Sequence, residues 1–483
     1  MNTMPKVLTS KGYAIRKSAL SDIERRRIET ELRVAPIVHR SYQGAEDLSF
    51  RIYRESPERY YLPRRWGENT FGKADGCLLS NGKELSAEAC VFKGTPYDYQ
   101  TAIVDTFIKA ADAGRMGGGG LICVPCGRGK TFMAIAIAAK LGRRFMVVVD
   151  KEFLMNQWKG EIQSLMPGLR IGICQAGKRE LDPALYDCTL CMIQTICGQD
   201  FPEKAFSDYG FTIFDECHHL GAQHFSKALM KIQTKVMLGL SATPKREDGL
   251  TKVFEWFLGE PVYWEKIREP DEGVIVQPVY VDCQDTAYTD VPVNWRQEPV
   301  MGKLLTHVVE CAPRTKQIVD LLKDICKDER RRVLVLSERI SHLKSIEEGL
   351  NDTSITIGYY IGGMKEEVRE AGATTAQVLL ASYAMASEAM NIKTLNCVVL
   401  ASPRKNVEQS TGRILRVQAN KRVVAPLIVD IVDVHGVYRS QWRKRSIYYR
   451  KCKYTISAEG EDGLDENVEL RGADENGCLF SDE

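Results

Sequence analysis

The run GLICVPCGRGKTFMAIAIAAK, residues 120–140, is the clearest indication of the fold class. An apolar run is followed by a glycine-rich turn and then by a helix-forming run. In this order the backbone N–H groups of Gly127, Arg128 and Gly129 and the helix dipole face a phosphate chain. Lys130 is then expected to pair with the β- and γ-phosphates of ATP, and the Thr131 hydroxyl to bind Mg²⁺. The strict pattern has glycine where this chain has Val124, so an ordinary glycine turn is the alternative.

Outward from this stretch, short apolar runs alternate with amphipathic ones, which is typical of parallel α/β domains. The sequence predicts two tandem RecA-like parallel-sheet domains, with a small N-terminal α+β domain and a disordered acidic tail. The expected divisions are residues 1–92 (accessory domain), 93–268 (ATP-binding domain 1), 269–299 (linker with an extra strand, 274–281), 300–455 (domain 2) and 456–483 (tail). The expected strands are 120–124, 145–149, 189–193, 211–214 and 236–240 in domain 1, and 332–336, 355–360, 378–381, 397–401 and 427–431 in domain 2. Gly117–Gly120 precedes a strand and is read as a flexible loop.

A carboxylate pair follows the fourth strand of domain 1, in the run Phe214-Asp-Glu-Cys-His-His219. Asp215 is predicted to hold Mg²⁺ through water, and Glu216 to polarise the attacking water. An isolated acidic pair at a strand end is more often a turn or helix cap. The position four strands into the domain that holds Lys130 favours the catalytic interpretation.

Three weaker motifs complete the set. Gln100, just before an expected helix at Thr101, could read the adenine edge through its amide, or could simply be an exposed polar residue. Ser241 and Thr243, in Ser241-Ala-Thr-Pro244, follow the fifth strand, where they could couple the nucleotide site to a nucleic-acid groove; alone this run is a common turn.

Arg413 and Arg416 lie three residues apart in Gln409-Ser-Thr-Gly-Arg-Ile-Leu-Arg416 and therefore share a helical face. Directed at the γ-phosphate from another domain, they would act as arginine fingers. A plain basic helix face is the alternative.

Bulk composition narrows the class of partner. The net charge is +2, but residues 459–483 carry ten acids against Arg471, so the rest of the chain is near +11. That excess suits a polyanion, although a solvated basic surface is commoner. No apolar run reaches the ~20 residues of a membrane span. Without a secretory signal we expect a reducing compartment, cytoplasmic or nuclear, or for a virus its cytoplasmic replication site or virion.

Cysteines and the two flanking segments leave alternatives open. Cys123-x-x-Cys126 and Cys188-x-x-Cys191 have zinc-ligand spacing, but their context favours buried small hydrophobes. Residues 51–66 interleave bases with aromatics, which suits either nucleic-acid stacking or a small domain with inward aromatics. In 439–453, seven bases could follow a phosphate backbone, or Trp442, Ile447 and Tyr448 could anchor a C-terminal helix.

The ordered set of motifs resembles superfamily 2 helicases over residues 93–455. Within them the chain is most similar to the branch of XPB-type, UvsW-type and poxvirus transcript-release helicases. The features that carry this are Leu154-Met-Asn-Gln-Trp158, Asp215-Glu-Cys-His-His219 and Arg246-Glu-Asp248. The resemblance implies that Gln157, Gln194, Thr195 and Ser382 lie along the strand-binding face, and that Arg246 lies near the point of strand separation.

One motif departs from this branch. Where Glu-Gly-x-Asp is usual, the chain reads Glu388-Ala-Met-Asn391, so Asn391 keeps an acceptor for a ribose hydroxyl without the charge. The expectation is an ATP-dependent DNA helicase or translocase, 3′ to 5′ by resemblance, acting on branched or transcribed DNA in viral transcription, recombination or repair. Its expected cofactors are ATP and Mg²⁺, with DNA as partner, RNA as an alternative, no membrane, and transcription or replication proteins as further candidates. The rivals are an RNA helicase of the same fold and a nucleotide-gated transcription subunit with weak hydrolysis. A restriction-enzyme motor subunit would need a nuclease partner.

Overall fold

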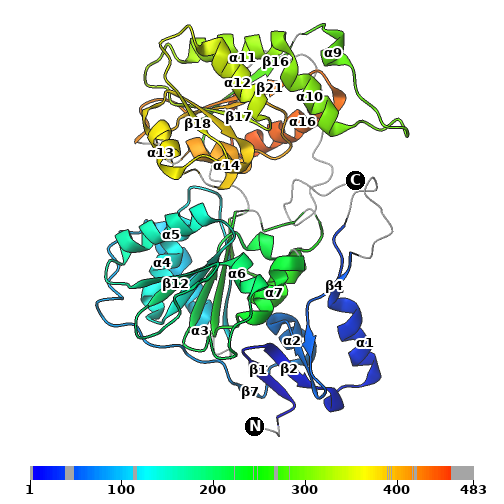
Figure 1. Ribbon diagram of the computed structural model, residues 1–483, viewed down its shortest axis with the longest axis vertical. Coiled ribbons are helices and arrows are strands. Elements are labelled where there is room, and N and C mark those ends of the chain that lie inside the picture. The colour runs from blue at the N-terminus through cyan, green and yellow to red at the C-terminus, as the bar shows by residue number, and fades with distance from the viewer. Residues whose placement is uncertain are drawn as a thin grey trace. The chain divides into compact units, whose positions relative to one another are not determined.

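The computed structural model describes residues 4–37, 48–112, 117–221, 223–242, 244–246, 248–265, 270–281, 283–388, 390, 392, 394–415, 417 and 421–457. Contacts divide the chain into two compact units. Unit 1 comprises Met1–Val124 and Arg128–Glu265; unit 2 comprises Lys266–Glu483 together with Pro125–Gly127. Figure 1 shows a large sheet flanked by helices in each unit, as the alternating sequence predicts, and a smaller N-terminal sheet in unit 1.

The N-terminal part of unit 1 is a small α+β layer. Its five-stranded sheet has the order β5-β6-β2-β1-β7. The strands are β1 (Lys6–Thr9), β2 (Gly12–Arg16), β5 (Arg54–Glu55), β6 (Arg59–Leu62) and β7 (Gly76–Cys77), with helices α1 (Asp22–Glu31) and α2 (Arg64–Phe71) and a separate pair, β3 (Arg33–Val34) and β4 (Phe50–Arg51). Tyr53, Tyr60 and Trp66 are buried. Of the two alternatives for residues 51–66, the aromatics therefore follow the inward-packing one.

Arg64 joins this layer to the rest of unit 1. Its side chain is fully buried, and its guanidinium donates to the carbonyl oxygens of Thr234, Lys235 and Gly118. A buried cation is costly unless it is hydrogen-bonded. The carbonyls supply those bonds, so Arg64 fixes α2 against the edge where the larger sheet begins.

The larger sheet of unit 1 has the order β11-β10-β12-β9-β13-β14-β8-β15 and is parallel except at the short strand β11. Its strands are β8 (Gly118–Cys123), β9 (Phe145–Val149), β10 (Ile171–Gln175), β11 (Lys178–Arg179), β12 (Cys188–Met192), β13 (Phe211–Phe214), β14 (Val236–Ser241) and β15 (Pro261–Trp264). The helices are α3 (Asp98–Asp112), α4 (Lys130–Leu141), α5 (Glu152–Leu165), α6 (Ile193–Gly198), α7 (Gln223–Lys231) and α8 (Thr251–Leu258), with the 3-10 helix η3 (Cys217–Gly221).

Residues alternate between two cores along these strands. Leu121 and Cys123 of β8 pack with α7 and α8, whereas Ile122 packs with α3, α4 and α5. Successive side chains of a strand point to opposite faces, so helices cover both faces of a parallel sheet. All five strands expected in domain 1 are present, within two residues of their expected limits. The sequence did not predict strands β10, β11 and β15.

Gly118, Gly119 and Gly120 lie in strand β8, so the expectation of a flexible loop is wrong for these three of the four glycines. Gly119 has φ +109°, and a Cβ there would lie 1.9 Å from the carbonyl oxygen of Met237 on β14. A Cβ on Gly118 would lie 2.2 Å from the carbonyl oxygen of Ala111. Only glycine permits this close approach of β8 to its neighbours.

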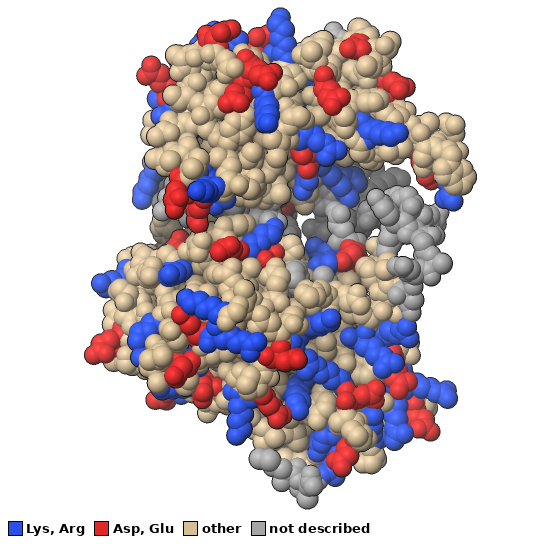
Figure 2. Space-filling view, viewed as in Figure 1, with Lys and Arg blue, Asp and Glu red and all other residues tan. Residues whose placement is uncertain are grey.

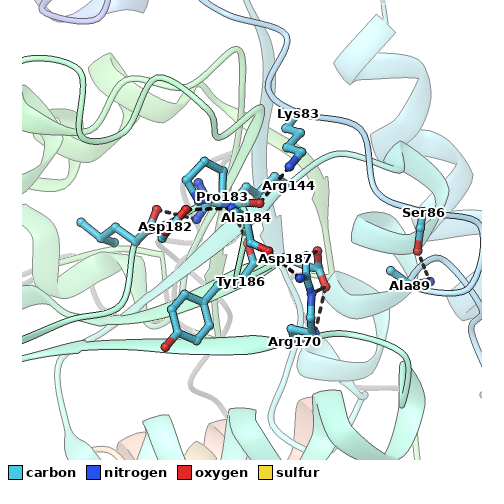
Figure 3. Close-up of polar contacts among 11 residues, drawn as sticks. Lys83, Ser86, Ala89, Arg144, Arg170, Asp182, Pro183, Ala184, Tyr186 and Asp187 are labelled. Carbon is cyan, nitrogen blue, oxygen red and sulfur yellow. Dashed lines mark hydrogen bonds and ion pairs between the residues drawn. The ribbon is translucent and has the colours of Figure 1, made fainter.

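The loop between β11 and β12 is fixed from several sides (Figure 3). Arg144, which is buried, donates to the carbonyl oxygens of Tyr186 and Leu181. Arg170 forms a two-bond ion pair with Asp187 through bonds of 2.8 and 2.7 Å. These bonds hold the start of β12 and so position the polar residues that follow its end.

The sheet of unit 2 is wholly parallel, with the order β18-β19-β17-β20-β21-β16-β22. Its strands are β16 (Ile275–Tyr280), β17 (Val333–Ser337), β18 (Ile357–Tyr360), β19 (Val378–Ser382), β20 (Cys397–Leu400), β21 (Leu427–Val432) and β22 (Thr455–Ile456). The helices are α9 (Thr286–Thr289), α10 (Met301–Glu310), α11 (Ala312–Ile325), α12 (Ile340–Leu350), α13 (Glu366–Thr375), α14 (Tyr383–Glu388), α15 (Glu408–Thr411) and α16 (Gly436–Lys451), with the 3-10 helix η4 (Gly412–Ile414). The extra strand expected in the linker is β16, an interior strand of this sheet between β21 and β22.

Helix α16 resolves the open alternative for residues 439–453. Trp442 and Tyr448 are buried, whereas Ile447 is exposed, so two of the three expected anchors face inward. Arg445 is also buried and forms two bonds with Asp430 on β21, of 2.8 and 2.7 Å. One of the seven basic residues, Arg445, thus has a structural role in an ion pair.

Three further expectations from composition concern the cysteines, membrane-spanning helices and the acidic tail. Cys123, Cys126, Cys188 and Cys191 are all buried, as expected of small hydrophobes. Across the described parts of the chain, no helix is long and apolar enough to cross a membrane. The acidic tail from residue 458 onward lies outside the described residues.

Candidate nucleotide-hydrolysis site and nucleic-acid interface

Three loops of unit 1 meet because of the strand order. β13, β14 and β8 are adjacent and parallel, with Phe214 opposite Gly239 and Ser241 opposite Cys123. The carboxyl ends of parallel strands lie at one edge of a sheet, where α/β proteins bind ligands. The loop before Lys130, the pair Asp215–Glu216 and Ser241 therefore lie at the same edge.

The phosphate loop has the expected backbone. Gly127 and Gly129 have φ +86° and +80°, and α4 begins at Lys130 with no side-chain cap on Gly129. Uncapped N–H groups at a helix start favour an anion. Thr131 follows in the first turn of α4, half-buried. The geometry fits a phosphate chain.

Lys130, Asp215 and Glu216 form a partly buried charged cluster. The Nζ of Lys130 lies 3.8 Å from Oε1 of Glu216, and the two side chains are 12% and 17% exposed. Oδ1 of Asp215 accepts the backbone N–H of Glu216 at 3.0 Å, and Oδ2 accepts the indole N–H of Trp158 at 2.8 Å. Burial, together with the charge of Glu216, raises the pKa of Asp215 to about 6. The two carboxylates, together with the hydroxyl of Thr131, which follows Lys130 in the chain, are a donor set that suits a hard divalent cation.

Glu216 also has an unusual backbone, with φ +42°. The left-handed region costs a non-glycine residue on the order of 1 kcal/mol and is enriched at functional sites. This conformation follows directly after β13.

His218 links the acidic loop to Ser241. Its Nδ1 lies 3.0 Å from the Ser241 hydroxyl and 3.5 Å from Oε2 of Glu216. Burial lowers the pKa of His218 to about 4, so the ring is neutral at neutral pH. A neutral imidazole joins the end of β13 to the end of β14.

Arg246 is held beside the same loop. Its guanidinium pairs with both carboxylate oxygens of Asp248 and donates to the carbonyl oxygen of His218. Its side chain is 16% exposed. The residue expected near strand separation is thus connected to the acidic motif.

Gln100 contacts the phosphate loop at Arg128. The Gln100 amide donates to the carbonyl oxygen of Arg128 at 3.1 Å and accepts the N–H of Tyr97 at 3.0 Å. Gln100 is 5% exposed, so the exposed-residue alternative is wrong. The Arg128 guanidinium stacks on Tyr99 at 3.9 Å and pairs with Glu265 at 3.1 Å.

The residues expected along the strand-binding face differ in exposure. Gln194 is exposed and donates to the carbonyl oxygen of Asp150 at 2.7 Å. Thr195 is buried, and its hydroxyl accepts the N–H of Ala176 at 2.9 Å. Gln157 on α5 is half-buried, and the Ser382 hydroxyl accepts the N–H of Met385 at 3.4 Å, at the start of α14.

For four predicted site residues the structure gives no side-chain position. Thr243, Asn391 and Arg416 are outside the described residues. The backbone of Arg413 lies in η4, but its side chain is not described. Their roles stay predictions.

Sequence reasoning assigned no role to Trp158, His218 and Glu265. Trp158 and His218 belong to the motifs quoted from the sequence. A polar side chain inside such a motif can be expected to contact the site, and this signal could have identified both residues. Glu265 lies 137 residues from Arg128, and no local pattern indicates that pair.

The comparisons with known proteins bear on the whole chain. Residues 93–246 match the family model described as Type III restriction enzyme, res subunit, and residues 314–418 match the Helicase conserved C-terminal domain. A protein of Acanthamoeba polyphaga mimivirus, provisionally named an ATP-dependent RNA helicase, is 32% identical over 94% of this chain and 87% of its own length. The chain belongs to the superfamily 2 helicases.

Other relatives of this helicase are also viral. An African swine fever virus protein, likewise provisionally named an ATP-dependent RNA helicase, is 27% identical and covers 77% of this chain and 76% of its own. A protein of Escherichia phage T5 named as a helicase is 25% identical over 67% and 70%. The solved structure of T4 UvsW covers 90% of this chain and 96% of its own at 18% identity and a TM-score of 0.34. The relatives from mimivirus, African swine fever virus and phage T5 make this a helicase of the viral type, and its activity is ATP-dependent.

Proposed function

We propose that this helicase acts on DNA, translocating 3′ to 5′ to unwind or remodel branched or transcribed molecules. The observation that carries the hydrolytic part is the cluster of Lys130, Asp215 and Glu216 at the edge formed by β8, β13 and β14. The DNA preference is supported by the motifs Asp215-Glu-Cys-His-His219 and Arg246-Glu-Asp248, which resemble those of DNA-acting members.

In this proposal unit 1 binds and activates ATP. Lys130 neutralises the β- and γ-phosphates, and the N–H groups after Gly127 cradle them. Glu216 accepts a proton from the attacking water as the general base. Gln100 reads adenine while it also supports the loop through the Arg128 carbonyl.

A magnesium ion fits the donors that are present. Thr131 and Asp215 would hold it, Asp215 through water, and it would neutralise charge between the β- and γ-phosphates. The Trp158 indole keeps Oδ2 of Asp215 directed, as expected of a group that orients a metal ligand.

Unit 2 completes the reaction in this proposal. Arg413 and Arg416 stabilise the charge that develops on the γ-phosphoryl group, and Asn391 binds a ribose hydroxyl. Because these residues belong to unit 2, hydrolysis requires closure of the two units, which couples ATP to movement.

Coupling to nucleic acid runs through Ser241 and Thr243. The His218–Ser241 hydrogen bond gives a direct route from the acidic motif to that strand end. The residues proposed to lie along the strand are Gln157, Gln194, Thr195, Arg246 and Ser382.

The N-terminal layer, proposed as an accessory domain (1–92), adds cations to unit 1. Figure 2 shows Lys and Arg, interspersed with acids, over this part of unit 1. Four arginines of the layer are exposed: Arg26, Arg27, Arg33 and Arg51.

The test compares ATP hydrolysis in the presence of single-stranded DNA, duplex DNA, forked DNA and RNA. We expect the largest stimulation with DNA, and displacement of a strand from a fork with a 3′ overhang. Stimulation by RNA alone would reject the DNA preference, and displacement only from a 5′ overhang would reject the polarity.

An RNA helicase is the second candidate, because two relatives carry that name. A nucleotide-gated subunit of a transcription complex is a third, motivated by Ala389 and Asn391. It predicts tight ATP binding and no nucleic-acid-stimulated turnover, whereas the proposed motor hydrolyses ATP continuously.

A further inference from the structure

The connection between α9 and α10 carries an exposed tryptophan. In Figure 1 this segment, residues 290–300, extends away from the body of unit 2. Trp295 is 83% exposed, whereas Trp66, Trp158 and Trp442 are at most 4% exposed. The indole of Trp295 is therefore available to stack on a ligand.

The segment is a built hairpin. The N–H of Asn294 donates to the carbonyl oxygen of Glu298 at 2.9 Å, and that of Gln297 donates to the carbonyl oxygen of Asn294 at 3.0 Å. The Asn294 side-chain oxygen accepts the N–H groups of Arg296 and Glu298 at 2.8 and 3.0 Å. Val293 and Pro299 form an antiparallel bridge below the turn. These bonds fix the turn that presents Trp295.

The base of the hairpin is anchored in the core of unit 2. Tyr288 on α9 is buried and donates to Oδ1 of Asp433 at 2.8 Å. Asp433 also pairs with Arg314 through bonds of 2.6 and 3.0 Å, with both side chains fully buried. The His435 ring lies 2.7 Å from the Tyr288 carbonyl oxygen. An anchored arm loses little entropy when its tip binds a ligand.

The chemistry of the tip favours an unpaired nucleotide. The Arg296 guanidinium lies 4.4 Å from the centre of the Trp295 ring. An indole face stacks on any base, and a neighbouring guanidinium attracts the adjoining phosphate. Residues 290–300 carry two acids, Asp290 and Glu298, and the Glu298 carboxylate accepts the Asn294 amide at 2.9 Å, so Arg296 is the group that would contact the phosphate.

We propose that Trp295 and Arg296 form a base-stacking site for single-stranded nucleic acid, outside the helicase motifs. The site rests on the proposed action on nucleic acid and adds to it a contact that takes no part in hydrolysis and that holds for DNA or RNA. Trp and Arg are also enriched at protein interfaces, so the experiment separates a base stack from a protein contact.

The experiment measures binding of fluorescein-labelled single-stranded oligonucleotides to the full chain and to Trp295→Ala, Trp295→Phe and Val423→Ala. Val423 is 79% exposed in unit 2 and serves as the matched control. Because a base–aromatic stack is worth about 1–3 kcal/mol, Trp295→Ala should weaken binding roughly fivefold or more. Trp295→Phe should retain most of the affinity, and Val423→Ala all of it.

An abasic scan identifies the stacked base. One position of the oligonucleotide is expected at which loss of the base weakens the wild type but not Trp295→Ala. ATP hydrolysis without nucleic acid should be unchanged in every variant, so failure here is distinct from failure of the ATP site. Wild-type affinity of Trp295→Ala, or an equal loss at every abasic position, would overturn the proposal and leave a protein contact as the role of the hairpin.

Discussion

The ion pair between Arg128 and Glu265 offers a quantitative test of the structure around the phosphate loop. Arg128 stands between two glycines of that loop, and Glu265 follows β15 at the end of unit 1. The Arg128 Nε and a Glu265 carboxylate oxygen are 3.1 Å apart, and the side chains are 14% and 11% exposed. Replacing both by alanine, singly and together, gives a double-mutant cycle.

The expected coupling energy follows from this burial. Exposed ion pairs contribute about 0.2–1 kcal/mol, whereas breaking a fully buried pair costs about 3–5 kcal/mol. One charge-assisted bond in a mostly buried place falls between these limits, at about 2 kcal/mol. The matched control is Lys140–Asp105, which also lies in unit 1 and has both side chains 49% exposed. Its cycle should give about 0.5 kcal/mol or less.

The assay is equilibrium unfolding in urea, which does not screen charges, followed by fluorescence of the tryptophans of unit 1. A second readout is the KM for ATP: Glu265→Gln should lower it, because the carboxylate no longer competes with phosphate for Arg128. A coupling energy as small as that of Lys140–Asp105 would show that burial does not strengthen the Arg128–Glu265 pair.

Two other predictions concern unit 2. His342 is 1% exposed, hydrogen-bonded to Ser337 at 3.0 Å, and burial lowers its pKa from 6.5 to about 3. The unfolded chain therefore binds the extra proton first, so stability present above pH 6.5 is lost as the pH falls towards 3. Between pH 6.5 and 4.5 the wild type should lose about 2 kcal/mol more than His342→Asn, measured by urea unfolding; parallel pH profiles would contradict this. Asp433→Ala should destabilise unit 2 by about 3–5 kcal/mol, because Arg314 is left charged and fully buried, and an unchanged thermal unfolding temperature would exclude that pair.

Much of the parallel-sheet architecture is predictable from the sequence, because buried strands are continuous apolar runs. Strands β9 and β13 have the expected limits. The edge strand β15 was not predicted, since Pro261–Trp264 is only half-buried and carries a proline. The sequence predicts a loop at the start of β8, where the structure has a strand. The glycines there allow β8 to lie close to β14 and Ala111, and no pattern in a single sequence indicates such a contact.

The candidate site likewise has residues that the sequence predicts and contacts that it does not. Lys130 and the pair Asp215–Glu216 follow from local motifs and strand order. The contacts that tune them are long-range in the chain, such as Trp158 with Asp215 and Arg128 with Glu265, and depend on tertiary packing. In residues 51–66 composition could not separate stacking on bases from inward packing, because both use the same residue types.

The central claim is that Glu216 activates water for hydrolysis of ATP held by Lys130. Its most direct test is a single-turnover measurement on Glu216→Gln, which keeps the shape of the side chain and removes its basicity. We predict that the variant binds ATP as tightly as the wild type and loses hydrolysis by about 10² to 10⁴-fold, the usual contribution of a general base. Hydrolysis by Glu216→Gln at the wild-type rate, with nucleic acid present, would contradict the account.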